Sequence, residues 1–290
     1  MRLTVIPALR APVVAAAAWA STWAASGVTV SQTAASRFAL VSVVDPRGRA
    51  LVDVGPDDFV VEEGGEPREI LDVRVADYPI VVILDTGALG RADFPSMQKA
   101  AARFLERLGP RPVAIVSMDG PPKLIASFDE ERHSVLTHLE SVTAASASDA
   151  EPAQPLRAAA LGARTIRESG TLFSALLLVT VSPVEVTGSA AEALIAPIVD
   201  SRAVVHVVAR AVPAGSGAPF WRGLAEQTQG EYTAIYSSAS YVPALDRLAN
   251  RLTTELMVEY LVPVGSKPTD PKVGIRMPGA RVRGLGVEPR

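Results

Sequence analysis

Continuous apolar runs alternate with amphipathic segments through the middle of the chain. Runs with so few polar residues are typical of strands buried on both faces of a sheet. They lie at 80–84, 113–118, 172–181 and 203–209. The segments between them place apolar residues at helical spacing, and Asp93 is expected to N-cap the first of these helices. Strands that alternate with helices predict the α/β class, with a mostly parallel sheet covered on both faces.

The period of the pattern changes to two on both sides of this central region. The predicted strands there are 38–44, 59–62 and 71–75 before it, and 256–262, 273–277 and 281–287 after it. Neither flank is long enough to form a robust core alone, so we expect the two flanks to pack together as one small β unit. The predicted organisation is an N-terminal β segment (37–77), an α/β domain (78–253) and a C-terminal β segment (254–290).

The first residues have the pattern of a secretory signal. Arg2 and Arg10 supply positive charge, 11–20 is an apolar core rich in alanine, and small residues suited to cleavage follow. The apolar stretch is too short to be a good membrane span, although a retained anchor or a plain tail stays open. We therefore expect a signal peptide at 1–25, a linker at 26–36, and export to the periplasm or the medium.

The composition excludes several classes of function. The chain has 290 residues, of which 48% are hydrophobic and 20% charged, enough for a sizeable core. A net charge of -3 argues against nonspecific nucleic-acid binding, which needs a basic face. The absence of cysteine removes disulfides, thiol nucleophiles and cysteine-ligated metals. No serine-hydrolase elbow, phosphate loop or dinucleotide fingerprint is present, so we expect neither an enzyme nor a cofactor.

The most informative position is Asp85. It follows the buried run 80–84 and opens a glycine-containing loop. In open α/β sheets, ligands bind at the carboxyl ends of the strands. Gly87 and Leu89 stand where a site for a hard cation would need hydroxyl oxygens. The pattern indicates the scaffold of a metal site that has lost most of its ligands.

Three stretches resemble the bacterial von Willebrand factor A-related proteins. They are 41–49, 58–64 and 79–85, and the resemblance extends over about 38–287. It implies a Rossmann-like von Willebrand A domain with a metal-ion-dependent adhesion site at its top, next to a short β region.

The adhesion site that the resemblance implies is degenerate in this chain. Such a site needs Asp-x-Ser-x-Ser after the first strand, a threonine in a later loop and an aspartate after the fourth strand. Asp85 matches the first aspartate, but Gly87 and Leu89 replace the two serines. Gln154 stands near the threonine position, and Ser182 follows the fourth strand without an aspartate. We therefore expect no metal site, because Asp85 alone could hold an ion only weakly.

Alternatives for Asp85 stay open at this point. Its carboxylate could accept hydrogen bonds from nearby backbone amides, which is the simpler interpretation. A weak cation site could also be rebuilt with Asp149 or Glu151. Asp119 lies at another strand end and could approach Asp85, but Asp-Gly before two prolines is more simply a hairpin turn.

These observations predict an exported, non-enzymatic, protein-binding protein of the adhesion or assembly type, independent of metal. The alternative is a divalent-cation-dependent adhesion domain with a site rebuilt around Asp85. If the partner, a protein or an envelope component, binds the carboxyl ends of the strands, recognition depends on shape, backbone hydrogen bonds and apolar contact. The predicted contacts are Asp85, Leu89, Gln154 and Pro183. An inert face, with binding at the β unit, also stays open.

Two further predictions concern single side chains. His206 lies mid-strand among valines, where packing in the core is a better interpretation than catalysis. Trp221 and Tyr236 lie beside loops, so among the aromatic residues of the second half we expect these two to be exposed.

Overall fold

The computed structural model describes residues 34–118, 120–145, 154–184, 186, 188–211 and 217–289. The chain divides into two units, Met1–Thr33 and Ala34–Arg290, and everything below concerns the second unit. The predicted signal peptide and residues Asp119, Asp149 and Glu151 lie outside the described residues. Within the described residues, no helix has both the length and the apolar character needed to span a membrane.

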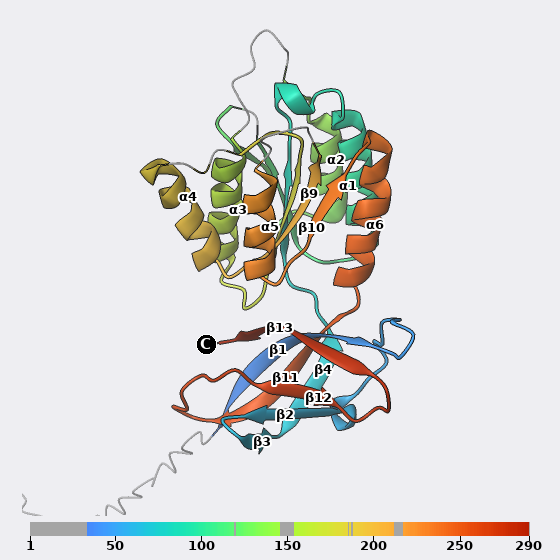
Figure 1. Ribbon diagram of the computed structural model, residues 1–290, viewed down its shortest axis with the longest axis vertical. Coiled ribbons are helices and arrows are strands. Elements are labelled where there is room, and N and C mark those ends of the chain that lie inside the picture. The colour runs from blue at the N-terminus through green and yellow to red at the C-terminus, as the bar shows by residue number, and fades with distance from the viewer. Residues whose placement is uncertain are drawn as a thin grey trace, which may run out of the picture. The chain divides into compact units, whose positions relative to one another are not determined.

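The described part of the α/β domain has a six-stranded central sheet (Figure 1). Its order is β10 (Tyr232–Ile235), β9 (Val204–Arg210), β8 (Ala175–Thr180), β5 (Ile80–Leu84), β6 (Val113–Ser117) and β7 (Lys123–Ala126). All neighbours are parallel except β7, which runs antiparallel to β6 at one edge. The central strands β5 and β8 are buried along their whole length, as their continuous apolar runs predict. The predicted mostly parallel sheet is confirmed.

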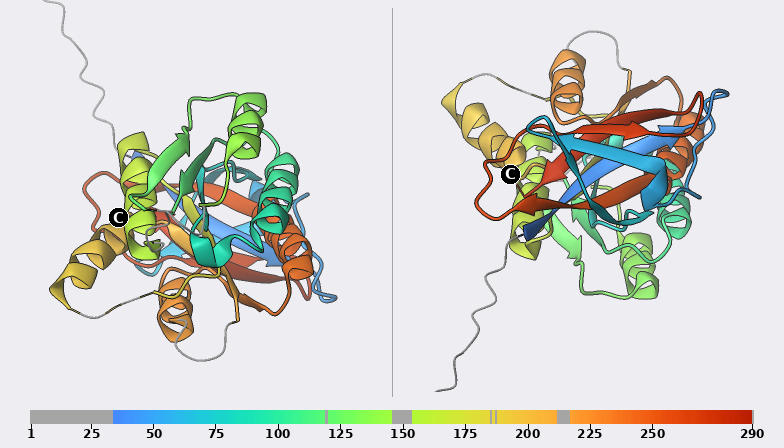
Figure 2. Two further views of the ribbon diagram at one scale, coloured as in Figure 1. Left: turned by 90° about the horizontal axis from the view of Figure 1, so that it is seen from above. Right: turned by 90° about the horizontal axis from the view of Figure 1, so that it is seen from below.

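Helices cover both faces of this sheet (Figure 2). One face packs against α1 (Phe94–Arg107), α2 (Arg132–Ser141) and α6 (Tyr241–Leu252). The other packs against α3 (Pro155–Ser169), α4 (Ser189–Asp200) and α5 (Ala218–Gln227). Helix α3 comes unusually close, since a Cβ atom on Gly162 would lie 2.9 Å from Leu176 and 3.0 Å from Val81. Two separate apolar cores therefore hold the sheet in place.

The N- and C-terminal flanks form one β unit, which confirms that prediction. A four-stranded antiparallel sheet has the order β13 (Arg281–Glu288), β1 (Ala34–Val44), β11 (Glu255–Pro263) and β4 (Ile70–Val75). A three-stranded sheet has the order β12 (Lys272–Ile275), β2 (Phe59–Glu63) and β3 (Glu66–Arg68). Inward side chains of both sheets, such as Val41, Phe59 and Val258, form a third core.

One boundary differs from the sequence-based expectation. Strand β1 begins at Ala34, inside the segment 26–36 that was expected to be a linker. Its first residues pair with the end of β11, with Ala34 opposite Pro263. The strand is therefore extended by a partner distant in sequence, which the local pattern of small and polar residues does not indicate.

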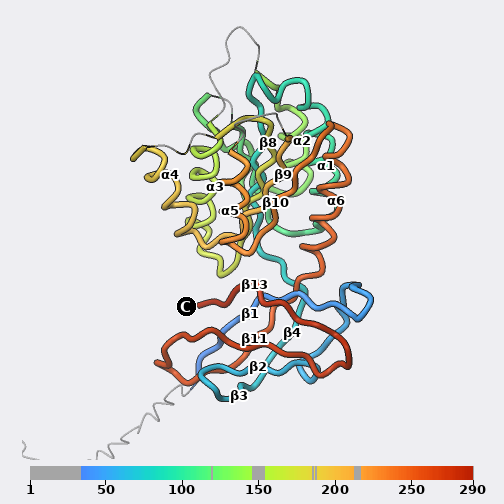
Figure 3. The backbone as a smooth tube through the Cα atoms, in the orientation of Figure 1, coloured from blue at the N-terminus to red at the C-terminus, as the bar shows by residue number. Residues whose placement is uncertain are grey.

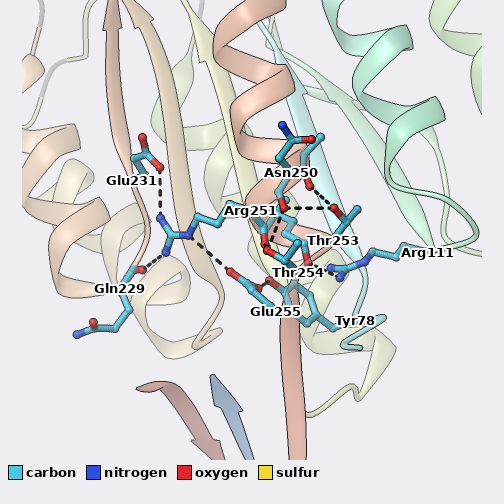
Figure 4. A network of polar contacts seen from close by, with 11 residues as sticks. Tyr78, Arg111, Gln229, Glu231, Asn250, Arg251, Thr253, Thr254 and Glu255 are labelled. Carbon is cyan, nitrogen blue, oxygen red and sulfur yellow. Dashed lines mark hydrogen bonds and ion pairs between the residues drawn. The ribbon is translucent and has the colours of Figure 1, made fainter. Parts of the chain in front are cut away.

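Two chain crossings connect the β unit to the α/β domain, one at 76–79 and the other at 253–254 (Figure 3). Figure 4 shows the buried polar contacts that tie them together. Arg111 donates hydrogen bonds to the carbonyl oxygens of Ala76, in the first crossing, and of Leu252, the last residue of α6 before the second crossing. The hydroxyl group of Tyr78 donates to the Glu255 carboxylate, and the Arg111 guanidinium lies 4.9 Å from the centre of the Tyr78 ring. We call this cluster the junction.

Candidate functional site

Asp85 directly follows strand β5, and it is completely buried. One carboxylate oxygen, Oδ2, accepts hydrogen bonds from the backbone N–H of Val181 (2.9 Å), the backbone N–H of Ser182 (2.7 Å) and the hydroxyl group of Thr180 (3.0 Å). The other oxygen, Oδ1, accepts one from the backbone N–H of Gly87 (3.1 Å). All four donors are neutral. The carboxylate therefore ties the loop after β5 to the loop after β8.

The chain directly after Asp85 folds back onto its carboxylate. The short 3-10 turn η2 spans Ala88–Gly90. A Cβ atom on Gly90 would lie 2.9 Å from the backbone oxygen of Asp85 and 3.0 Å from its Oδ1. This close approach requires glycine, and it packs the turn against the carboxylate and keeps solvent away from it.

These residues do not fit the metal ion that the resemblance implies. A divalent cation of this kind needs several oxygen ligands, while Oδ2 of Asp85 already receives three hydrogen-bond donors. Leu89 offers no oxygen and its side chain is 65% exposed. Among the described residues, no group of three or more His, Cys, Asp or Glu side chains could hold a metal ion. The geometry is that of a carboxylate holding two loops through neutral hydrogen bonds.

A second buried carboxylate, Asp93, lies at the same edge of the sheet. It occupies the N-cap position of α1, as predicted, but its side chain makes no capping hydrogen bond. Instead, both of its oxygens accept hydrogen bonds from Nη1 of Arg210, at the end of β9, and Oδ2 also accepts one from the hydroxyl group of Tyr241 (3.3 Å). A charge-assisted hydrogen bond is stronger than a hydrogen bond to a neutral amide. This explains why the Asp93 carboxylate binds the guanidinium of Arg210 and not the backbone N–H groups at the start of α1.

The protonation states of Arg210 and Tyr241 are set by Asp93 and by burial. Asp93 raises the pKa of Arg210 through their hydrogen bond and charge attraction. Burial, together with the Asp93 carboxylate, raises the pKa of Tyr241 well above the ordinary value for tyrosine. Arg210 is therefore cationic and Tyr241 a neutral donor at any physiological pH.

Tyr236 directly follows the last residue of β10, at the same edge of the sheet. In the sheet Ile235 pairs with Arg210, and the N–H of Ala211 donates to the Ile235 carbonyl (2.8 Å), so Tyr236 follows directly beside the end of β9. Its side chain is 80% exposed, as predicted. The same prediction is wrong for Trp221, which is 1% exposed because its face of α5 turns into the core.

The predicted contact residues have different positions. Leu89 and Pro183 are exposed, and both lie in loops at the carboxyl ends of the strands. Gln154 is half-buried, and its Oε1 has no hydrogen-bond partner. Asp85 is completely buried, so the prediction that it contacts a partner directly is wrong. It can act on a partner only through the loops that it holds.

Arg210 was not among the residues predicted from the sequence. The sequence could have indicated it, because an arginine at the end of a buried apolar strand is as unusual as the aspartate that follows β5.

His206 lies in the middle of the same strand and is 1% exposed. Burial and the nearby Arg251 lower the pKa of His206 to about 3, so it is a neutral packing group.

The β unit has a polar cavity of its own. It has a volume of about 520 Å³, and its lining includes Arg37, Glu63 and Thr269. Arg37 and Glu63 form a buried ion pair, and the N–H of Thr269 donates to the same Glu63 carboxylate (3.1 Å). These polar groups pair mainly with one another, as in a structural ion pair that joins β1 to β2.

Comparison with known proteins supports the fold. No family model matches the chain, and no curated protein sequence matches it. A von Willebrand factor type A structure from Catenulispora acidiphila has a TM-score of 0.53 at 10% identity, over 89% of this chain and 73% of that one. BatB from Bacteroides thetaiotaomicron has a TM-score of 0.48 at 16% identity, over 60% of this chain and 97% of that one. The chain has a von Willebrand A-like fold.

Proposed function

We propose that this protein is a non-enzymatic protein-binding module that uses the carboxyl edge of its central sheet, without a bridging cation. The carboxyl edge means here the loops after β5, β8, β9 and β10. The observation that carries the proposal is the environment of Asp85, whose carboxylate is occupied by four neutral donors. The loops after β5 and β8 are thus tied together by the protein itself, and Leu89 after β5 and Tyr236 after β10 are exposed to solvent.

Exposed apolar and aromatic side chains are suitable anchors for a protein interface. Leu89 is 65% exposed although it is a large apolar side chain, and Tyr236 is 80% exposed. Tyrosine is one of the residue types that contribute most to binding energy in interfaces. The closest competing function is cation-dependent adhesion, which Ser182 favours because its hydroxyl oxygen is buried without a hydrogen-bond partner.

Affinity capture tests the proposal. The full chain serves as bait for envelope extracts, with and without a chelator. Leu89→Asp should lower the amount of captured partner by more than about fivefold, since a charge placed in an apolar contact costs more than about 1 kcal/mol. Leu71→Asp is the matched control, because Leu71 is 44% exposed but lies in the β unit.

The outcome separates the alternatives. Capture that resists chelator and fails for Leu89→Asp supports the proposal. Capture abolished by chelator supports the cation-dependent alternative. Loss of capture for Leu71→Asp alone places the interface on the β unit and contradicts the proposal.

Export is part of the proposed function and rests on the N-terminal sequence alone. The charge of Arg2 and Arg10 and the apolar core 11–20 support cleavage between about Ala20 and Ser26. Mass spectrometry of protein recovered from the envelope or the medium tests this, and an intact Met1 in the exported protein would contradict cleavage.

A further inference from the structure

Strand β10 is an outer strand of the central sheet, and part of its backbone has no hydrogen-bond partner. It pairs with β9 alone, and the N–H of Val207 in β9 donates to the Glu231 carbonyl. Alternate residues of a strand turn their N–H and C=O groups to opposite sides, so those of Tyr232 and Ala234 face away from β9. Among the described residues, no hydrogen bond reaches these outward groups. We call this row of backbone groups the β10 edge.

The described chain leaves the β10 edge uncovered. Ala234 is exposed, and Tyr236, directly after the strand, is 80% exposed. The described chain leaves β9 at Ala211 and resumes at Gly217, where a Cβ atom would collide with the Val184 side chain. Val184 follows β8, which lies on the other side of β9 from β10. Gly217 therefore lies away from the β10 edge.

The other outer strands of the described sheets carry features that hinder pairing with a further strand. Lysine, proline, other charged side chains and register irregularities all act in this way. Strands β7, β4 and β13 each have a register irregularity toward their neighbour. The hindering residues are Lys123 in β7, Arg74 in β4, Arg283 in β13, Lys272 in β12 and Pro67 in β3. Strand β10 reads Tyr-Thr-Ala-Ile and pairs with β9 in unbroken register, so none of these features protects it.

The side chains on one face of β10 suit an added strand. Tyr232 packs against the core on the α5 side of the sheet, and the Arg222 guanidinium of α5 lies 5.3 Å from the centre of its ring. Burial raises the pKa of Tyr232, Arg222 lowers it and Tyr236 raises it, so Tyr236 also lies near this ring. Ala234 is on the same face of the strand as Tyr232. Its small side chain leaves room beside the aromatic rings for an apolar side chain of a neighbouring strand.

We propose that the β10 edge binds an extended segment of a partner protein, which adds to the central sheet as a further strand. Unpaired N–H and C=O groups along an edge are matched by those of another strand, and alternate side chains then set the specificity. The matching segment places an apolar side chain beside Ala234. The contact is the backbone of β10 and not the loops of the carboxyl edge, so the inference goes beyond the proposed function.

A single segment fits the β10 edge better than a second copy of this chain. Helices α5 and α6 both contact β10. A copy that paired through its own β10 would bring two more helices toward them, and helices are about 10 Å across whereas paired strands are about 4.8 Å apart. A single extended segment brings no helices with it.

Hydrogen exchange of the full chain, followed by nuclear magnetic resonance, tests the inference. The probe is the capped peptide acetyl-Lys-Thr-Val-Thr-Val-Thr-Lys-amide, whose valines share one face of a strand. Its matched control carries N-methyl groups on the three central residues, which removes N–H donors on both sides and keeps the side chains. The peptide should slow exchange at the amides of Tyr232 and Ala234 at least about tenfold, and the methylated control should bind at least about tenfold more weakly, because several hydrogen bonds are lost.

Three variants make the assignment specific. Ala234→Pro removes an outward N–H and no hydrogen bond to β9, so it should abolish binding of the peptide. Ala234→Ser keeps the N–H and is the matched control, which should bind as the wild type does. Leu89→Asp should also bind the peptide normally, although the proposed function expects it to lose its partner at the carboxyl edge. If Ala234→Pro fails to fold, the methylated peptide still decides the question with the wild-type protein.

Other outcomes overturn the inference in distinguishable ways. Equal binding of both peptides, or no binding up to millimolar concentration, would reject strand addition. Slow exchange at Tyr232 and Ala234 without peptide would show that the edge is already covered. If that protection rises with protein concentration, a second copy occupies the edge, and if it does not, another part of the chain does.

Discussion

Two buried carboxylates in this molecule are stabilised in opposite ways. Asp85 at the carboxyl edge is completely buried, and its donors among the described residues are neutral groups of the loop after β5, the end of β8 and the loop after β8. Glu255 at the junction is 1% exposed and is surrounded by ionisable groups: the Tyr78 hydroxyl donates to it, and Arg251 lies 3.6 Å away. Burial raises the pKa of Glu255, while Tyr78, Arg251 and Arg111 oppose that rise.

The difference shows what each carboxylate does for the structure. At the junction, charged side chains tie together chain crossings that are far apart in sequence, and the cluster in Figure 4 links α6, β10 and β11. At the carboxyl edge, one carboxylate fixes the backbone of two loops and leaves no charged group of its own at the surface. The edge is therefore organised to present loops, whereas the junction is organised to hold two parts of the chain together.

Removing the Asp85 carboxylate should have the largest effect on the free energy of unfolding. Asp85→Ala leaves the N–H groups of Gly87, Val181 and Ser182 without their acceptor in a buried place. The free energy of unfolding should fall by about 3 kcal/mol, because each unsatisfied buried donor costs about 1–3 kcal/mol and partial relaxation is expected. Urea denaturation measures the change, with the exposed Asp200→Ala as control.

Hydrogen exchange makes this prediction specific to the edge. In Asp85→Ala the amides of Val181 and Ser182 should exchange faster, while those of β11 stay protected. Unchanged protection at both amides would show that Asp85 does not hold the loop after β8.

Removing the hydrogen bond between Tyr78 and Glu255 at the junction should lower the free energy of unfolding by a smaller amount. Tyr78→Phe removes the hydroxyl donor from Glu255 and leaves the packing of the ring in place. Stability should fall by about 2 kcal/mol, the range for hydrogen bonds to charged groups. Tyr236→Phe, at a tyrosine that is 80% exposed, should change it by less than about 0.5 kcal/mol. Equal losses in the two variants would contradict the structural role of the junction.

Acid should destabilise the folded protein through His206, which is buried in β9. Its pKa is lowered from 6.5 to about 3 in the folded protein, so the folded state binds fewer protons than the unfolded state between these values. The contribution of His206 to stability is present above pH 6.5 and is lost progressively as the pH falls toward 3. At pH 5.5 the loss is about 1.3 kcal/mol relative to pH 7.

The variant His206→Leu isolates this titration, because neither ring nitrogen of His206 has a hydrogen-bond partner that would be lost. The difference in unfolding free energy between pH 7 and pH 5.5, measured in urea, should shrink by about 1.3 kcal/mol in the variant. An identical pH dependence in both proteins would show that His206 is accessible to protons in the folded state.

The sequence predicts the frame of this molecule better than the contacts at its edge. Unbroken apolar runs identify the buried strands, and period-two flanks identify the β unit, because burial on two faces or on one leaves a local pattern. Asp85 is found in the same way, as a charge that ends such a run.

The hydrogen-bond donors of Asp85 leave no such pattern in the sequence. The N–H groups of Val181 and Ser182 belong to the backbone, and every residue except proline has such a group. The pair of Asp93 with Arg210 joins residues 117 positions apart, and only the fold brings them together. Trp221 was misplaced for a related reason, because a position beside a loop does not reveal which face of a short helix turns inward.

Thermal melting of the full chain with and without Mg²⁺ tests the central claim most directly. A ligand that binds only the folded state stabilises it by about 2.7 kcal/mol at a hundredfold excess over its dissociation constant, and a metal site of this kind would raise the melting temperature by several degrees. With Asp85 occupied by neutral donors, we expect no difference between millimolar Mg²⁺ and chelator. A chelator-reversible rise of several degrees that disappears in Asp85→Ala would contradict the account.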